Sequence, residues 1–343
     1  MSARVAIAGF GLAGEVFHAP LIDAVDGLEV SVVVTRDAER GARAVERYPG
    51  VRVMESAEEA FREADVAVIA TPNRFHAPLA LAALRRGLHV VVDKPFALSS
   101  AEASEVLSAA GGRLTVFQNR RWDGDFLTAA RVVREGRLGE VTRFESRFER
   151  FRPAIKEGWR ELASPEEGGG ALLDLGPHLV DQAIVLFGRP RRVYAEVDAR
   201  RLLAEVDDDV FIAIEHVSGV RSHLRLGAVS PLGGRSLVVS GLEGGFGTEG
   251  LDPQESQLKL GRGPGDPGFG ERERDPGRFV GLDGVIDDVP LERGRYEEFY
   301  AGVAAWVAGE APPPVDPADS LLGLQVLEAA RRSATSHEVV ELP

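Results

Sequence analysis

Lys94 occupies a position where a lysine could take part in chemistry. It follows the apolar run Val90–Val92 and an aspartate, and it directly precedes Pro95. Three consecutive valines predict an interior strand of a parallel sheet, which is buried on both faces. Ligands of such sheets bind just beyond the carboxyl ends of the strands, so the Lys94 ammonium group would lie where a ligand binds. The alternative is an ordinary surface lysine, because lysine is rarely buried.

Asp174 and His178 form a second candidate, four residues apart at the predicted start of a helix. Side chains at this spacing share one face of a helix. Histidine suits proton transfer because its pKa lies near neutrality. Two simpler interpretations stay open, namely that Asp174 is the N-cap of the helix and that His178 is a partly buried structural histidine. Pro177 is compatible with a first helical turn.

A glycine-rich loop follows the first predicted strand and opens a helix, which is the context that a dinucleotide-binding loop requires. The first glycine allows a tight turn, the second lets the backbone approach a pyrophosphate, and the third lets the helix pack against the strand. The free N–H groups at the helix start favour bound phosphate. A plain glycine turn is the alternative. The loop residues are Gly9, Phe10, Gly11, Leu12, Ala13 and Gly14.

The end of the second predicted strand indicates which dinucleotide binds. An acidic residue there holds the ribose 2′-hydroxyl of NAD, whereas an arginine accommodates the 2′-phosphate of NADP. Arg36 stands at this position, and Thr35 adds a hydroxyl donor. We therefore predict NADP. NAD remains the alternative because a shift of one residue would present the carboxylate of Asp37 to the ribose.

Other predicted strand ends carry polar residues that could contact ribose or nicotinamide. For the loop after the fourth strand, an ordinary capped turn is the alternative, because Asn and Thr favour helix starts. The remaining cofactor candidates are Thr71, Pro72, Asn73, His76, Asp93, Lys94, Pro95 and Asn119.

Candidate substrate contacts follow the last strand of the first half and precede the glycine-rich run at residue 168. Aromatic faces cover C–H surfaces of sugars, and charged side chains bind hydroxyl groups. The alternative for several of them is a surface ion pair. They are Arg120, Trp122, Asp123, Arg152, Lys156, Trp159 and Arg160.

Short apolar strands alternate with helical stretches in the first third of the chain, and these elements must position the candidate residues. This alternation predicts a parallel sheet with helices on both faces. Strands are expected at 5–8, 29–34, 51–54, 66–70, 88–92 and 114–117, and helices at 13–24, 38–47, 57–63, 75–86 and 99–110.

Beyond residue 118 the pattern changes to alternating strands such as 142–149, where Phe144 and Phe148 share one face and charged residues the other. This predicts an open, largely antiparallel sheet with one free face. Helices are expected at 125–135, 177–187 and 319–334, and a surface loop at 261–278.

The composition of the chain narrows the classes of function. Its 343 residues favour two domains, and its net charge of −14 argues against binding to nucleic acid or to an anionic membrane surface. It has no cysteine, which excludes disulfides and thiol chemistry. Because the first predicted strand begins at residue 4 or 5, we expect no signal peptide and a cytoplasmic location.

Taken together, the motifs resemble the glucose–fructose oxidoreductase / inositol dehydrogenase / rhizopine catabolism (Gfo/Idh/MocA) family. Their order and spacing match over nearly the whole chain, most clearly over residues 5–190. One branch, with NADP-linked scyllo-inositol dehydrogenases, is especially similar. The motifs are the glycine loop, Thr71-Pro72-Asn73 with His76, Asp93-Lys94-Pro95, the runs 17–20 and 118–123, and the run Gly168–His178.

The resemblance implies a Rossmann domain over 1–120 and a substrate-binding, oligomerising α/β domain over 121–343, whose last helix could pack back on the first. It places the catalytic positions on Lys94, Asp174 and His178, and the bond before Pro95 is often cis in the family. His178 would act as base in oxidation, Lys94 would polarise the substrate oxygen, and Asp174 would orient His178 or hold a hydroxyl. No metal is required.

The function that this resemblance implies is hydride transfer between a nicotinamide and a secondary alcohol of a cyclitol, sugar or sugar derivative. A homodimer or homotetramer through the second sheet is expected. Two alternatives remain, an NAD-using glycoside hydrolase of the same fold and a non-catalytic sensor of dinucleotide or sugar. A sensor would be expected to lack Lys94 or His178, and both are present.

Overall fold

The computed structural model describes residues 2–156, 158–272 and 275–343. The chain forms two compact units, and neither is continuous in sequence. The first comprises Met1–Trp122, Pro253–Gly270 and Arg295–Ala318, and the second comprises Asp123–Asp252, Glu271–Gly294 and Asp319–Pro343. The late helix that joins the first unit is therefore α10 (Glu297–Val307), whereas α11 (Pro317–Ser336) belongs to the second unit from Asp319 onward.

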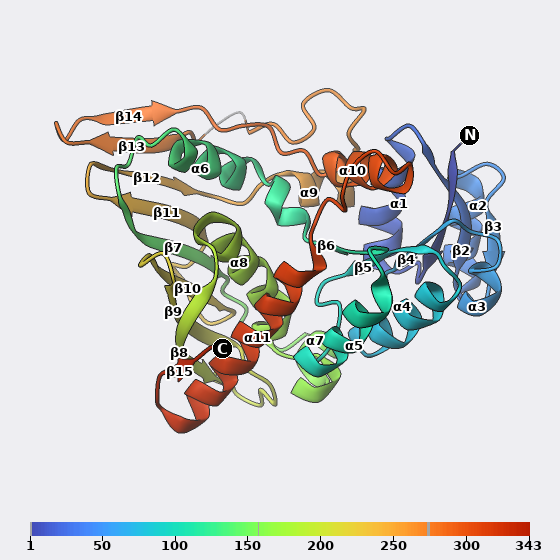
Figure 1. The fold of residues 1–343 in the computed structure, drawn as a ribbon, viewed down its shortest axis with the longest axis horizontal. Helices are drawn as coiled ribbons and strands as arrows, with labels where there is room; N and C mark the ends of the chain where they lie inside the picture. Colours follow the sequence, from blue (N-terminus) through green and yellow to red (C-terminus); the bar gives the residue numbers. More distant parts are fainter. Residues whose placement is uncertain (1, 157, 273–274) are drawn as a thin grey trace. The chain divides into compact units, whose positions relative to one another are not determined.

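The first unit is built on a parallel sheet with the strand order β3-β2-β1-β4-β5-β6 among the described residues (Figure 1). This order confirms the predicted Rossmann sheet. It reverses between β1 and β4, which is the switch point where such sheets bind ligands. The strands are β1 (Ala3–Ala8), β2 (Leu28–Val34), β3 (Arg52–Met54), β4 (Val66–Ile69), β5 (His89–Asp93) and β6 (Leu114–Phe117).

The helices of the first unit lie close to their predicted positions. Three of them begin at a side chain that accepts the backbone N–H three residues on, namely Asp37, Ser56 and Ser99. The elements are a π-helical segment η1 (Leu12–His18) running into α1 (Ala19–Asp23), then α2 (Ala38–Arg47), α3 (Ala57–Ala60), η2 (Asn73–Phe75), α4 (His76–Arg85), α5 (Ser100–Ala110), η3 (Asn119–Trp122) and the late α9 (Gln254–Lys259).

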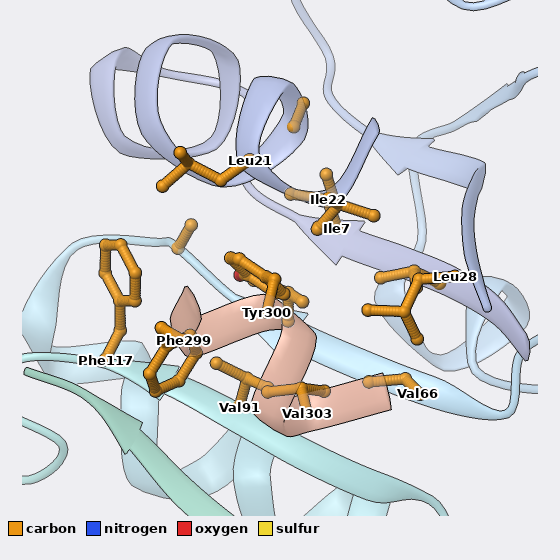
Figure 2. Packing of buried hydrophobic residues seen from close by; sticks show 14 of the residues in the cluster. Ile7, Leu21, Ile22, Leu28, Val66, Val91, Phe117, Phe299, Tyr300 and Val303 are labelled. Carbon is orange, nitrogen blue, oxygen red and sulfur yellow. The ribbon is translucent and has the colours of Figure 1, made fainter. Parts of the chain in front are cut away.

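Helix α10 completes the core of the first unit. Its Phe299, Tyr300 and Val303 are fully buried in one hydrophobic cluster with Ile22 of α1 and Val91 of β5. Figure 2 shows these α10 side chains among residues of α1 and the sheet. The core of the Rossmann unit therefore depends on a helix that follows nearly all of the second unit in sequence.

The second unit contains a nine-stranded sheet in the order β14-β13-β12-β11-β7-β10-β9-β8-β15 within the described residues. In the part of this sheet that the structure describes, β7 and β10 pair in parallel and the other neighbouring strands pair antiparallel, which confirms a largely antiparallel sheet. The strands are β7 (Val141–Glu149), β8 (Pro190–Asp198), β9 (Asp209–His216), β10 (Arg221–Gly227), β11 (Arg235–Gly241), β12 (Gly244–Glu249), β13 (Gly277–Gly281), β14 (Ile286–Val289) and β15 (Val340–Glu341).

One face of this sheet is covered by α6 (Gly124–Arg134) and α8 (Ala171–Phe187), as Figure 1 shows. Phe144 and Phe148 are buried and Arg143 and Arg147 are exposed, as predicted from the alternation. Shorter turns are α7 (Trp159–Leu162) and η4 (Pro165–Glu167). Among the described residues, no helix is both long and apolar enough to cross a bilayer.

Helix α8 begins earlier than the sequence suggested. Its N-cap is Gly170, and Asp174 lies inside the first turn with its N–H bonded to the Gly170 carbonyl at 3.1 Å. The interpretation of Asp174 as the N-cap was therefore wrong. The cap is supplied by Asp207 from the segment before β9, whose carboxylate accepts the Leu172 N–H at 2.6 Å.

Candidate cofactor and catalytic site

Two glycines of the loop after β1 are required by close backbone approaches. Gly9 has a φ of 98°, and a Cβ atom there would lie 2.6 Å from the Ala70 carbonyl oxygen. A Cβ atom at Gly14 would lie 2.1 Å from the Gly9 carbonyl oxygen. The first glycine thus makes the turn, and the third lets η1 pack against the strand, as the motif predicts.

Gly11 differs from these two because the space beside it is open. Among the described residues, the nearest atom to a Cβ there would be Arg40 Nη1 at 3.7 Å. The N-cap of η1 is Gly11, which has no side chain to cap the first-turn N–H groups. The loop therefore fits a dinucleotide pyrophosphate.

The residues after β2 differ in how they are engaged. Arg36 is exposed, whereas the Asp37 carboxylate accepts the Arg40 N–H at 3.1 Å and so caps α2. That backbone hydrogen bond holds the pKa of Asp37 below its ordinary value. Thr35 Oγ1 accepts the Asp37 N–H at 3.2 Å. Because the Asp37 carboxylate is engaged with the helix start, it is poorly placed to receive a ribose hydroxyl.

Arg40 is a candidate that the sequence analysis missed. Its guanidinium lies beside the open space at Gly11, and it stands four residues after Arg36. Arg36 precedes the N-cap Asp37, and Arg40 lies in the first turn of α2. The signal available in the sequence was a second arginine in the first turn of the predicted helix 38–47.

His76 ties two of the cofactor loops together. Its ring is 1% exposed, and its nitrogens lie 2.7 Å from the Pro95 carbonyl oxygen and 2.8 Å from that of Thr71. Burial lowers the pKa of His76. A neutral imidazole has one N–H, so His76 donates to one of these carbonyl oxygens and packs against the other. His76 would therefore serve a cofactor by positioning these loops. Asn73 is also buried, while Thr71 and Pro72 are partly or fully exposed.

Lys94 follows β5 at the carboxyl edge of the sheet, where the sequence placed it. The Lys94–Pro95 bond is cis, as the resemblance implied. The Lys94 N–H donates to Asp93 Oδ1 at 2.8 Å. Burial works to raise the pKa of Asp93, but the His18 ring and the Lys94 charge hold it below its ordinary value. The backbone of Lys94 is therefore anchored to an ionised carboxylate.

The residues after β6 are buried and make contacts within the first unit, whereas a substrate contact needs an accessible side chain. Asn119 and Arg120 are buried, and Arg120 Nη2 donates to Glu255 Oε2 of α9 at 2.7 Å. Trp122 packs edge-on against Phe299 with ring centroids 5.6 Å apart. These contacts fix the segment. Asp123 is fully buried and belongs to the second unit.

Asp174 and His178 lie four residues apart on α8, in the second unit. Asp174 is partly exposed and His178 is 7% exposed. Gly170, which precedes them, leaves room for the capping carboxylate of Asp207, since a Cβ at Gly170 would lie 2.3 Å from Asp207 Oδ1. Lys94 belongs to the first unit, so joint action of the three residues is part of the proposal below.

The second group of predicted substrate contacts lies between β7 and α8. Arg152 is partly exposed, Lys156 is exposed, and Trp159 and Arg160 begin α7 with side chains outside the described part of the structure. The segment is held by the buried Arg201, whose Nη1 donates to the carbonyl oxygens of Arg152 and Ala154 at 3.1 and 3.3 Å. Arg201 also pairs with Asp208 and Glu161 at 2.8 and 3.1 Å. No motif in the sequence marks this arginine as a candidate.

The fold and the glycine loop define a Rossmann dinucleotide-binding protein. Residues 3–119 match the oxidoreductase family with an NAD-binding Rossmann fold, and residues 126–247 match the GFO/IDH/MocA C-terminal domain. The chain belongs to the GFO/IDH/MocA family and is an oxidoreductase with an NAD-binding domain. The resemblance seen in the motifs is thereby confirmed.

Similar proteins cover nearly the whole chain. The uncharacterized oxidoreductase YdgJ of Escherichia coli K12 is 38% identical, over 96% of both chains. The scyllo-inositol 2-dehydrogenase (NADP(+)) IolW of Bacillus subtilis is 31% identical, over 99% of this chain and 96% of that protein. The solved structure of the putative oxidoreductase yvaA from Bacillus subtilis superposes with a TM-score of 0.94 at 30% identity, covering 100% of this chain and 99% of that one.

Proposed function

We propose that this oxidoreductase uses NADP to oxidise a secondary alcohol, or to reduce the ketone, of a cyclitol, sugar or sugar derivative. The observation that carries the proposal is the anchored Lys94 at the same sheet edge as the glycine loop. The family positions Asp174 and His178 supply the proton-transfer side. The similar Bacillus subtilis protein IolW is an NADP-linked scyllo-inositol dehydrogenase by name, which supports this substrate class.

When bound, the nicotinamide supplies the site that accepts or gives the hydride. His178 takes the hydroxyl proton in oxidation and returns it in reduction. Lys94 donates a hydrogen bond to the same oxygen and stabilises the charge that develops on it. Asp174 orients His178 or holds a neighbouring hydroxyl, and the segment that carries Arg152, Trp159 and Arg160 contacts the rest of the polyol.

A panel of inositols, aldoses and keto-sugars, followed by absorbance of the reduced cofactor, tests the substrate class. We expect turnover of at least one polyol or its ketone with NADP. No turnover of any member with NADP or NAD would contradict the dehydrogenase proposal. Release of a glycoside leaving group without net cofactor reduction would favour the hydrolase, and cofactor binding with neither activity would favour the sensor.

The role of Lys94 is tested by Lys94→Ala. Loss of the hydrogen bond to the reacting oxygen should lower kcat by on the order of 1,000-fold. NADPH affinity, measured by nicotinamide fluorescence, should change by less than about threefold, since the phosphates bind at the glycine loop. Normal turnover in this variant would exclude Lys94 from the chemistry.

The preference for NADP rests on the arginines beside the glycine loop. Arg36→Ala should weaken NADPH binding by about tenfold or more, which corresponds to one lost charge-assisted contact, and leave NADH binding unchanged. Arg40→Ala should weaken the binding of both cofactors, because Arg40 lies beside the pyrophosphate space at Gly11. Arg47→Ala is the matched control, because Arg47 is exposed in the last turn of the same helix. Equal losses for NADPH and NADH in Arg36→Ala would mean that Arg36 does not read the 2′-phosphate.

Self-association through the second sheet is the remaining part of the proposal. Alternate residues of β7 and β10, among them Arg143, Arg147, Arg221 and Arg225, leave one charged face of this sheet exposed. Such a face can pair with a second copy of itself in a two-fold dimer. Light scattering should give a dimer or tetramer mass, and a monomer mass at micromolar concentration would contradict this part.

A further inference from the structure

A buried polar chain lies beneath the carboxyl end of β5. The His18 side chain, at the end of η1, has no exposed surface, and its Nδ1 is 2.6 Å from the hydroxyl oxygen of Tyr300. Its Nε2 is 3.9 Å from Asp93 Oδ2. Tyr300 belongs to α10 and is also fully buried. Figure 2 shows it among the core side chains of this unit. Three elements far apart in sequence therefore meet at one imidazole.

The chemistry of the two neighbours sets the direction of the hydrogens. The Asp93 carboxylate, ionised at neutral pH, can only accept, so Nε2 is the nitrogen placed to carry a hydrogen toward it. Burial raises the pKa of Tyr300 well above its ordinary value, so its hydroxyl keeps a hydrogen that it can donate to Nδ1. Tyr300 thus selects the imidazole form that points N–H at Asp93.

The second oxygen of the Asp93 carboxylate contacts Lys94. Oδ1 accepts the Lys94 N–H at 2.8 Å, while Oδ2 faces His18. The His18 ring is itself held in place, since it lies 4.4 Å, centroid to centroid, from the Phe117 ring at the end of β6. One carboxylate therefore connects a fixed histidine to the backbone of the proposed catalytic lysine.

We propose that His18 is a positioning residue for Lys94, which it orients through Asp93, and that Tyr300 holds His18 in the required form. This rests on the function proposed above. The 3.9 Å gap between Nε2 and Oδ2 is an electrostatic contact. The effect on rate follows because a displacement of about 1 Å at a reacting group can cost on the order of 100-fold.

The kinetic test compares His18→Leu, His18→Gln and Tyr300→Phe. His18→Leu should lower kcat by about 10- to 100-fold, with the polyol KM and the NADPH Kd changing by less than about threefold. His18→Gln should recover most of the loss, because its amide nitrogen can take the place of Nε2 and donate to Asp93. Tyr300→Phe should give an intermediate loss. Tyr48→Phe is the matched control, since Tyr48 is a buried tyrosine of the same core that is not part of the contacts between Tyr300, His18 and Asp93.

A second readout does not depend on turnover. Hydrogen exchange at the Lys94 amide, followed by mass spectrometry of peptides that span it, should speed up at least about threefold in His18→Leu and stay unchanged in Tyr48→Phe. Nitrogen NMR of labelled histidine should show His18 with hydrogen on Nε2 in the native chain.

These outcomes separate the inference from the proposed function. A native chain that turns over no polyol contradicts the function. Unchanged Lys94 exchange in His18→Leu, or a His18→Gln variant no better than His18→Leu in kcat, overturns the positioning role. Equal losses in kcat for Tyr48→Phe and Tyr300→Phe overturn the role of Tyr300.

Discussion

The glycine-loop edge of the first unit and the Arg235 network of the second unit place their polar groups in different ways. In the first unit the candidate site residues follow the ends of β1, β2, β4 and β5, so each is a few residues from a strand that sets its position. In the second unit the buried Arg235 of β11 contacts Asp125, Ser146 and Gln182 from three other elements. Sites built on strand ends can be recognised in a sequence, whereas networks of this second kind are defined only by tertiary packing.

The largest expected effect comes from breaking the Arg235 network. Arg235 Nε lies 3.4 Å from Asp125 Oδ2, and both side chains are almost fully buried. Arg235→Leu leaves a buried carboxylate without its cation and should lower the free energy of unfolding in urea by about 3–5 kcal/mol. Arg143→Leu, which breaks an exposed pair with Glu145, should cost less than about 1 kcal/mol. Similar losses of unfolding free energy in both variants would mean that the buried Arg235 pair stabilises the fold no more than the exposed Arg143 pair.

The glycine loop should separate stability from binding. Gly14→Ala forces a methyl group against the Gly9 carbonyl and should cost about 1–3 kcal/mol of unfolding free energy. Gly11→Ala has room and should change stability by less than about 0.5 kcal/mol. It should nevertheless raise the NADPH Kd by on the order of tenfold, because the methyl group occupies the space for the pyrophosphate. Unchanged NADPH affinity in Gly11→Ala would mean that the pyrophosphate does not bind beside Gly11.

Arg201 tests whether a buried network in the second unit serves the substrate. Arg201→Met removes the donors that hold the Arg152 and Ala154 carbonyls and should raise the polyol KM about tenfold, equivalent to about 1.4 kcal/mol. The NADPH Kd should not change. The neighbouring Arg200→Met is the control, since Arg200 is largely exposed. If steady-state kinetics show the same KM in both variants, the 152–160 segment does not depend on Arg201 for binding.

Asp207 should produce the smallest effect, and one that depends on pH. Burial raises its pKa above the ordinary value of 3.8, against the opposing bond from Leu172 N–H. The folded state then binds the proton more tightly than the unfolded state, so the native chain loses stability as pH rises through this window. Asp207→Asn does not titrate. The difference in unfolding free energy, Asp207→Asn minus native, should therefore increase from pH 4 to neutrality and then level off.

Urea unfolding of both proteins at several pH values measures this difference. A difference that falls with rising pH would mean that the capping bond outweighs burial at Asp207. Asp93 in the first unit has the opposite shift, so its contribution should be lost as pH falls below about 4.

The predictable part of the site is the part that depends on local backbone geometry. Gly9, Gly11, Gly14, Arg36 and Lys94 could be named because loop conformation and strand ends restrict residue type. Arg40, Arg201 and the contact between His18 and Tyr300 could not, because their partners are far away in sequence or marked by no motif. The start of α8 was misplaced for the same reason, since its cap, Asp207, comes from another segment.

The discontinuous first unit has a consequence for synthesis of the chain. Tyr296, Phe299, Tyr300 and Val303 are core residues of the Rossmann unit, yet they leave the ribosome only after nearly all of the second sheet. Until then the apolar side chains of α1 that they cover, Leu21 and Ile22, stay open to water. Because domains emerge and fold from the N-terminus onward, an N-terminal fragment ending near residue 120 should be an aggregation-prone intermediate that needs chaperone protection. The nucleotide-binding half thus matures late, after most of its companion unit has been made.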